Sequence, residues 1–250
     1  MLASLIIILL SIEYKNSNDY QQLRNKYQIK ISNNCGPSLT YSLVGEKLII
    51  KGTGNMKDYD SDDIRAPWHI NYSQIQIVEL SEEMTSIGSW AFWECINLVN
   101  ITIPENITVI GRYAFENCES LKTITIPSKV TKIENGLFYS CSKLTSINFS
   151  GNVKSIGQNA FANCISFTSI IIPENVTSIG VATFSNCSNL ISLTIPEKVT
   201  RIEYNFCHDC INLKSIKILG DVIEIGSGVF YNCTSLSYVK IPENVSFIGS

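Results

Sequence analysis

Nine cysteines are the residues of this 250-residue chain with the greatest capacity for chemistry. Seven of them recur at a constant spacing of 23 residues, at Cys95, Cys118, Cys141, Cys164, Cys187, Cys210 and Cys233. Thiols at fixed spacing on stacked strands about 4.8 Å apart could form disulfides or bind zinc. However, their number is odd, and a position repeated in every unit needs one shape throughout. We therefore expect a column of small, buried hydrophobic side chains.

Residues 207–210 have the C-x-x-C spacing of redox and metal pairs. The 23-residue register explains both cysteines without such a role. Cys210 belongs to the column, and Cys207 occupies the position of Phe184, with Phe206 displaced by one residue. We predict neither a redox site nor a metal site here.

Other groups that could carry catalysis or bind metals are isolated. An acidic run lacks the glycine and the distal glutamate of an EF-hand calcium loop, so we expect a solvated loop there. Its members are Asp58, Asp60, Asp62 and Asp63. The two histidines, His69 and His208, stand in no nucleophile–base context, and no phosphate-binding glycine loop occurs. We expect no enzyme activity, no cofactor and no metal.

Composition excludes several classes of protein. The chain carries 19 Lys and Arg against 22 Asp and Glu, a formal net charge of −3. This balance provides no cationic excess for binding nucleic acid. An apolar content of 45% is inconsistent with a disordered chain. No apolar run reaches about 18 residues, the length that a membrane-spanning helix requires.

An internal repeat organises the chain from residue 75 onwards. Phenylalanine, isoleucine–proline and isoleucine–glycine recur with the same 23-residue spacing as cysteine, without insertion or deletion. The consensus is L-x-x-I-x-I-P-x-x-V-x-x-I-G-x-x-A-F-x-x-C-x-x. Seven complete units and a partial eighth can be aligned: 75–97, 98–120, 121–143, 144–166, 167–189, 190–212, 213–235 and 236–250.

Each part of the unit has a structural interpretation. The segment 98–103 alternates apolar and polar residues and predicts a half-buried strand, which Pro104 ends because proline has no N–H group. Residues 107–110 predict a second, short extended segment, and Gly111 turns the chain. The segment 112–118 has apolar residues spaced for one face of a short helical turn.

Self-similarity at this period is typical of a leucine-rich-repeat solenoid, in which stacked units share their apolar faces. We predict an α/β repeat that is mostly β, with a parallel strand ladder and short helical turns. The units should form a right-handed curved array with an N-terminal cap.

The regions outside the repeats have separate interpretations. Residues 1–12 contain a short apolar run and predict a possible signal peptide, and residues 13–34 predict a linker or a short helix over 19–27. Residues 35–74 predict an N-terminal cap containing strands at 38–43 and 47–51, with Trp68 covering the first repeat. Cys35 in this cap has no assigned role. The chain stops within its eighth unit, so we expect either a longer parent protein or an end protected by association.

Strand residues that point away from the core form two neighbouring columns, which we call the strand face. Solenoids expose an extended surface there, so this face is our candidate for binding a partner protein. A plain solvated ladder of Ser and Thr is the alternative. The face contains Asn100, Thr102, Thr123, Thr125, Ser146, Asn148, Ser169, Ile171, Ser192, Thr194, Ser215, Lys217, Tyr238 and Lys240. Lys217, Tyr238 and Lys240 cluster at its C-terminal end and are plausible contact residues.

Eight N-x-S/T sequons are compatible with a secreted glycoprotein. The repeat consensus generates such sequons by itself, so they permit glycosylation without demonstrating it. They begin at Asn71, Asn100, Asn106, Asn148, Asn175, Asn186, Asn232 and Asn244.

These motifs resemble BspA-like leucine-rich repeats. The resemblance is carried by LKTITIPSKVTKIE at 121–134 and by I-G-x-x-A-F-x-x-C at 110–118 and 156–164. The cap is also similar to the opening of that family, through CG at 35–36, IKGTGNM at 50–56 and APW at 66–68. Departures from the consensus are few: Ser150, Leu219, Glu134, Glu203 and Phe167.

The resemblance implies a curved solenoid displayed on a cell surface, without enzyme activity. Members of the family act as adhesins or surface antigens that bind host matrix proteins or other cells. We therefore expect a protein-binding module at the cell surface or secreted, with an extracellular protein as its partner and no nucleic acid. The alternative is an intracellular leucine-rich-repeat scaffold, which free thiols in a reducing cytoplasm would favour.

Overall fold

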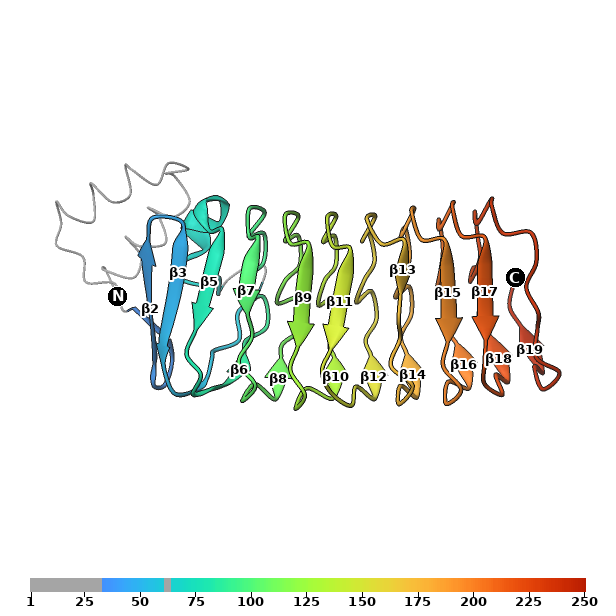
Figure 1. Cartoon of the computed structure of the whole chain (residues 1–250), viewed down its shortest axis with the longest axis horizontal. Coiled ribbons are helices and arrows are strands. Elements are labelled where there is room, and N and C mark those ends of the chain that lie inside the picture. The colour runs from blue at the N-terminus through green and yellow to red at the C-terminus, as the bar shows by residue number, and fades with distance from the viewer. Residues whose placement is uncertain (1–32, 61–63) are drawn as a thin grey trace.

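Two rows of parallel strands run along an elongated stack of coils (Figure 1). The computed structural model describes residues 33–60 and 64–250. The first row consists of β5 (Ile77–Leu80), β7 (Asn100–Thr102), β9 (Thr123–Ile126), β11 (Ser146–Phe149), β13 (Ser169–Ile170), β15 (Ser192–Ile195) and β17 (Ser215–Ile218). The second row consists of β6 (Met84–Ile87), β8 (Val109–Ile110), β10 (Lys132–Ile133), β12 (Ser155–Ile156), β14 (Ser178–Ile179), β16 (Arg201–Ile202), β18 (Glu224–Ile225) and β19 (Phe247–Ile248).

The register between units confirms the repeat. Thr123 of β9 pairs with Ser146 of β11, and Arg201 of β16 pairs with Glu224 of β18. Both pairs are offset by 23 residues, as are the other pairings between repeat strands. Each side chain therefore lies beside its equivalent in the next unit, and the predicted parallel solenoid is correct.

The third side of each coil, which we call the turn edge, differs from the expected helical turn. Over residues 112–118 the chain forms consecutive turns, closed by hydrogen bonds such as Glu116 N–H to the Tyr113 carbonyl at 3.2 Å. Tyr113 and Asn117 have φ values of 56° and 58°, which no α-helix contains. Among the described residues, η1 (His69–Gln74), a 3-10 helix, is the one helical element.

The turn edge has its own ladder between units. Phe92 N–H donates to the carbonyl of Ala114 at 2.8 Å, and Phe115 N–H donates to that of Leu137 at 3.1 Å. The same pattern, with the acceptor 22 residues ahead, recurs along the array. All three sides of the coil are thus joined to the next unit by backbone hydrogen bonds, which satisfies polar groups that the core would otherwise leave unpaired.

Phenylalanines form a stacked column inside the coils. Neighbouring rings from Phe92 to Phe184 have centroids 5.4–5.8 Å apart and lie within 20° of parallel. The column then changes, as the register predicted: Cys207 fills the next position, and the Phe206 ring meets Phe184 edge-on at 5.4 Å. Both substitutes are fully buried, so the core remains filled where the consensus fails.

The repeated glycine serves close packing rather than turning the chain. A Cβ atom on Gly111 would overlap the backbone of Ser89 in the preceding unit, and one on Gly180 would overlap that of Gln158. Neither glycine has a positive φ. Close approach of the units therefore favours glycine at these positions, although Glu134 and Glu203 show that the equivalent position in other units can hold a side chain.

The N-terminal part adds antiparallel strands to the first row. β1 (Asn34–Gly36) pairs with β2 (Leu39–Val44), and β2 pairs with β3 (Lys47–Gly52), which lies parallel to β5. β4 (Gly54–Asn55) joins the second row beside β6. The two strands expected at 38–43 and 47–51 are therefore present.

Trp68 covers the first repeat from the N-terminal side. Its ring is 1% exposed and stacks on Phe92 at 6.0 Å. The indole N–H donates to the Ala91 carbonyl at 2.8 Å, and Tyr59 N–H donates to the Ser89 carbonyl at 3.0 Å. Both carbonyls belong to the turn edge of the first unit. Along the array, such carbonyls accept hydrogen bonds from the preceding repeat unit. Here Tyr59 and Trp68 supply the donors instead.

Several predictions concern residues that are not described. The signal peptide at 1–12, almost all of the linker at 13–34 and the helix at 19–27 lie outside the described residues, as do Asp62 and Asp63. Two other aspartates of the acidic run bind the backbone: Asp58 Oδ1 accepts from Ser89 N–H and Asp60 Oδ1 accepts from Ile64 N–H, both at 2.7 Å. The division into cap and repeats at residue 74 remains a prediction.

Replacing Phe138, a ring in the middle of the column, should destabilise the protein strongly. We expect Phe138→Ala to lower the free energy of unfolding by about 3–5 kcal/mol, because it leaves a cavity between two stacked rings. Denaturation with urea, followed by circular dichroism, would measure this change. Ile171→Ala removes a side chain that is 87% exposed and should change stability by less than about 0.5 kcal/mol. Equal effects of the two substitutions would contradict the importance of the column.

Candidate protein-binding surface

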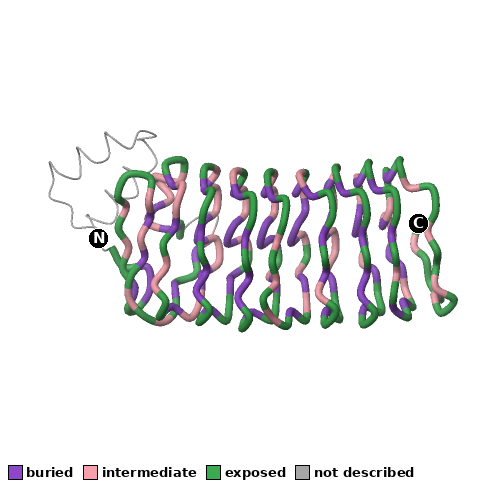
Figure 2. The backbone as a smooth tube through the Cα atoms, viewed as in Figure 1, coloured by how far each residue is buried: buried purple, intermediate pink, exposed green. Residues whose placement is uncertain are grey.

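All fourteen residues of the strand face are exposed. They alternate with buried residues, as Thr123 and Thr125 do with Ile124 and Ile126 in β9. Figure 2 shows buried and exposed residues following one another along the backbone of these coils. The prediction that these side chains point away from the core is therefore correct, whereas their binding of a partner remains a proposal.

Strand pairing brings members of the face together. Asn148 lies beside Thr125 in the pairing of β11 with β9, and Lys217 lies beside Thr194 in that of β17 with β15. The face is divided among three hydrogen-bonded groups of strands, β5–β7, β9–β11 and β13–β15–β17. Tyr238 and Lys240 lie one repeat further on and belong to no strand.

Ile171 and Tyr238 are the large apolar side chains of the face. Ile171 is 87% exposed, and Tyr238 is 71% exposed. The flanking residues Ile170 and Ile172 are buried, so the outward position of Ile171 follows from strand alternation. An aliphatic side chain this exposed contributes nothing to the core and is available for contact.

The N-terminal end of the first row carries an ion pair. Lys47 Nζ lies 2.6 Å from Glu79 Oε1, and Glu79 pairs in register with Thr102 of the strand face. Both side chains are about half exposed, so this pair contributes little stability. However, Lys47 neutralises the charge of Glu79, the one carboxylate that lies in register with the columns of the strand face.

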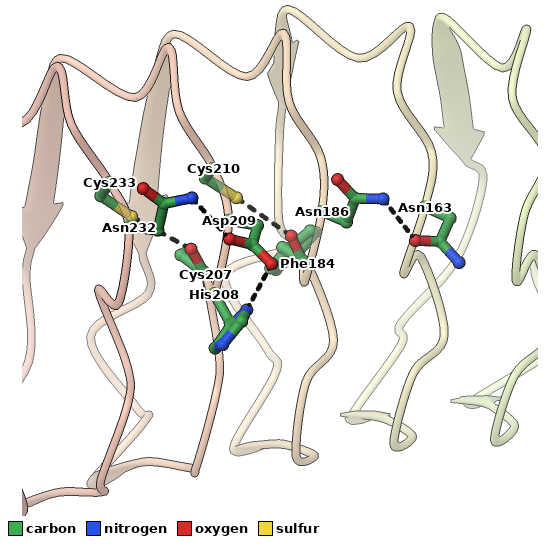
Figure 3. Close-up of polar contacts among 9 residues, drawn as sticks. All are labelled: Asn163, Phe184, Asn186, Cys207, His208, Asp209, Cys210, Asn232 and Cys233. Carbon is green, nitrogen blue, oxygen red and sulfur yellow. Dashed lines mark hydrogen bonds and ion pairs between the residues drawn. The ribbon is translucent and has the colours of Figure 1, made fainter.

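The cysteine column lies on the turn edge of the coil, away from the strand face. Its thiols fill small buried positions and also form hydrogen bonds. Cys210 Sγ–H donates to the carbonyl of Phe184 at 3.1 Å, and Cys233 Sγ–H donates to that of Cys207 at 3.0 Å (Figure 3). The same bond, to the residue 26 positions earlier, recurs at Cys118, Cys141, Cys164 and Cys187. Each of these six thiols thus joins its unit to the preceding one.

All nine cysteines are free and buried. Burial raises the pKa of the Cys35 thiol to about 11 and that of the Cys233 thiol to about 12. Burial likewise raises the pKa of Cys118 and Cys164 far above the ordinary value. Because the thiolate is the reactive and metal-binding form, these thiols are poor nucleophiles and poor metal ligands in the folded protein.

Polar side chains also form a ladder along the turn edge. Asn186 Nδ2 donates to Asn163 Oδ1 at 2.7 Å, and Asn232 Nδ2 donates to Asp209 Oδ1 at 2.8 Å (Figure 3). His208 Nδ1 lies 2.8 Å from Asp209 Oδ2. The Asp209 carboxylate therefore binds His208 of its own unit and Asn232 of the next unit, and so links the two units.

Sequence reasoning missed why asparagine recurs before the cysteine. Asn117, Asn163, Asn186 and Asn232 have φ values of 56–62°, a left-handed conformation that asparagine tolerates better than most residues. Their repetition one residue before the column was the available signal. Two of them, Asn186 and Asn232, begin sequons. The left-handed backbone conformation is therefore sufficient to explain asparagine at these two sequons.

The described residues contain no group of three or more His, Cys, Asp or Glu side chains placed to hold a metal ion. Cys207 and Cys210 take core positions, as their register predicted. A shallow depression of about 520 Å³ lies over β12 and β14, away from the strand face, and Lys132, Gln158 and Glu203 are among its lining residues. In the part of the chain that is described, no helix has the length and apolarity needed to cross a membrane.

Comparison with known proteins agrees with the repeat geometry. The model of the BspA type leucine rich repeat region matches residues 68–190 and 154–250, with six copies. The crystal structure of the leucine-rich repeat protein of T. pallidum is similar, with a TM-score of 0.62 and 25% identity, covering 82% of this chain and 90% of that chain.

Two further crystal structures match less closely. A leucine rich cell surface protein from Faecalibacterium prausnitzii has 23% identity and a TM-score of 0.45, covering 88% of this chain and 85% of its own. A leucine-rich repeat protein from Bacteroides ovatus has 18% identity and a TM-score of 0.45, covering 87% of this chain and 91% of its own. No curated protein sequence matches.

The buried thiols should make the protein sensitive to alkaline pH. Their pKa values are raised in the folded state, so their contribution to stability is complete below the unfolded pKa of about 8.5–9 and is lost as the pH rises from there towards the folded value. We expect the free energy of unfolding, measured with urea under reducing conditions, to fall between pH 8 and pH 10.

One cysteine can be separated from the rest. Cys164→Ala should make this fall shallower by up to about 1.4 kcal/mol per pH unit, because one titrating group is removed. Val153→Ala, which also truncates a fully buried side chain, should leave the slope unchanged. Identical slopes for wild type and Cys164→Ala would show that this thiol has the same pKa in the folded and unfolded states, and would contradict the prediction.

Proposed function

The chain belongs to the BspA-type leucine-rich repeat family, and from this membership we propose that it is a non-enzymatic protein-binding module that acts at a cell surface as an adhesin or surface antigen. Family membership indicates a protein-interaction scaffold. The role in adhesion and the position at the cell surface are the further steps of the proposal.

The strand face is the observation that carries the proposal. Fourteen exposed side chains lie on a regular backbone in which each unit is hydrogen-bonded to its neighbours. A partner that binds there meets a surface already ordered before contact, so little conformational entropy is lost on binding. The partner class that fits is an extracellular matrix or cell-surface protein with an extended contact region.

Surface display is supported by two features. The family membership is one. The apolar run of residues 5–10 near the start of the sequence, which is of the kind found in secretory signals, is the other.

A second candidate is an intracellular scaffold. Nine unpaired thiols favour it, because oxidising compartments favour disulfides. Their burial weakens this argument, since a thiol that solvent does not reach is protected from oxidants in either compartment.

Protease treatment of intact cells would decide between the two compartments. We expect a tag placed after Ser250, on the protein expressed in its native cell, to be lost when intact cells are treated, because the chain is displayed outside. A cytoplasmic marker in the same cells should survive. Persistence of the tag under conditions that remove a known surface protein would favour the intracellular scaffold.

Substitutions on the strand face should abolish adhesion without unfolding the array. We expect Thr125→Glu combined with Thr194→Glu to reduce adherence of expressing cells to immobilised matrix proteins at least about tenfold, because two bulkier, charged side chains obstruct a complementary surface. Thr131→Glu combined with Thr200→Glu is the matched control, since both threonines are exposed but lie off the face. Equal adherence of the two double variants would place the binding surface elsewhere.

A further inference from the structure

The exposed side of the first strand row has a charge opposite to that of the chain. We consider the positions of Val99, Asn100 and Thr102 and their equivalents at 23-residue steps as far as Lys240. All 21 side chains are exposed, and none is Asp or Glu. The charged members are all lysines: Lys122, Lys214, Lys217 and Lys240. Four lysines and no carboxylate give these positions a formal charge of +4 in a chain with a net charge of −3, and the one carboxylate in line with them, Glu79 of β5, pairs with Lys47.

Three of these lysines gather in the last two units. Lys214 and Lys217 belong to one unit, and Lys240 belongs to the next. Among the described contacts, none of the three ammonium groups has an ion pair or a side-chain hydrogen bond, and the same holds for Lys122.

Several cations on the other sides of the coil are bonded differently. Lys132 lies 2.8 Å from Glu134, and Arg201 lies 2.9 Å from Glu224. Lys198 donates to Asn175 in the preceding unit at 2.6 Å. Lys143 and Lys154, which also lie off the strand row, have no side-chain partner among the described contacts, so what distinguishes the strand row is that it holds unpaired lysines and no carboxylate.

Apolar side chains precede this cationic group. Ile171 and Ile191 are 87% and 44% exposed in the two preceding units, and Tyr238 is 71% exposed beside Lys240. The surface therefore changes from aliphatic to cationic over four consecutive units. A ligand that matches it has an aliphatic group at one end and negative charges at the other.

Strand spacing sets the separation of those two features. Ile171 and Lys217 are two strands apart, or about 10 Å, and Lys240 is one unit further, at about 14 Å. An extended polypeptide advances about 3.3 Å per residue. Side chains that share one face of an extended chain are two residues, or about 6.6 Å, apart. A peptide that crosses the strands with its aliphatic side chain against Ile171 and Ile191 would therefore present carboxylates to the lysines two and four residues further on.

We propose that this surface binds an extended acidic segment of a partner protein, in which an aliphatic side chain packs on Ile171 and Ile191. Glu or Asp residues two and four positions away, on the same side of the extended segment, pair with Lys214, Lys217 and Lys240. The inference rests on the proposed function, because it names the chemistry of the partner that the strand face recognises. A polysaccharide would satisfy the lysines but has no aliphatic side chain for Ile171.

A peptide array tests the proposal with the full chain. Immobilised 12-residue peptides on a Gly/Ser background carry one Leu and two Glu residues. The two Glu residues are two positions apart, and the nearer one lies one to six positions after the Leu. We expect the strongest binding when the nearer Glu is two positions after the Leu, and about tenfold weaker binding when both Glu residues become Gln. Raising the salt concentration should weaken the Glu-dependent part.

Matched variants locate the site. The triple variant Lys214→Gln, Lys217→Gln and Lys240→Gln should bind the best peptide about tenfold more weakly. Lys122→Gln removes an exposed lysine four units away in the same column as Lys214 and should bind within about twofold of wild type. Circular dichroism of both variants would verify that the array is intact.

Several results would overturn the inference. These are the absence of peptide binding, equal binding of Glu and Gln peptides, or a heparin oligosaccharide that binds more tightly than every peptide. Self-association in sedimentation experiments that the triple variant abolishes would make a second copy the occupant and would likewise overturn it. If peptides bind regardless of charge and Thr125→Glu with Thr194→Glu abolishes this binding, the proposed function stands and the inference alone fails. Binding that responds to neither set of substitutions would contradict both.

Discussion

Backbone hydrogen bonds that join each unit to the next impose an offset of one repeat on the whole chain. On the two strand sides they keep a 23-residue register, and on the turn edge they run from Phe92 to Ala114 and from Phe115 to Leu137. An insertion within any side would break the pairing of that side with both neighbouring units. This constraint explains why no residue is gained or lost along the array.

The same constraint places every side chain against its own equivalent. A position must therefore hold a residue that packs well against itself, as the phenylalanine rings do at 5.4–5.8 Å. The thiol satisfies a second requirement, because it fills a small space and also donates to a carbonyl of the preceding unit. Departures are compensated within a unit, as Cys207 and Phe206 show. Exposed positions have no such requirement, which leaves the strand face free to vary.

The predictable part of the structure is the part that repeats. Strands, their order and the outward direction of Thr125 or Ser192 follow from period and alternation, because these depend on local geometry alone. The helical turn predicted for the turn edge is wrong, because a spacing of three and four residues fits consecutive turns as well as a helix. The left-handed conformation of Asn163 and the thiol bond of Cys164 depend on contact with neighbouring units. The identity of a partner depends on a second molecule, so the sequence defines a surface and its charge only.

The turn edge gives the array an electrical direction. In ordinary sheets the dipoles of successive peptide groups largely cancel. Here the N–H groups of Trp90, Phe92 and Glu94 all point to the following unit, and the carbonyls that receive them point back. Their dipoles add along the molecule, as in a helix, with the partial positive charge towards the units that carry Lys217 and Lys240. A negatively charged partner would therefore experience a field that differs between the two ends, and would be oriented before any side chain touches it.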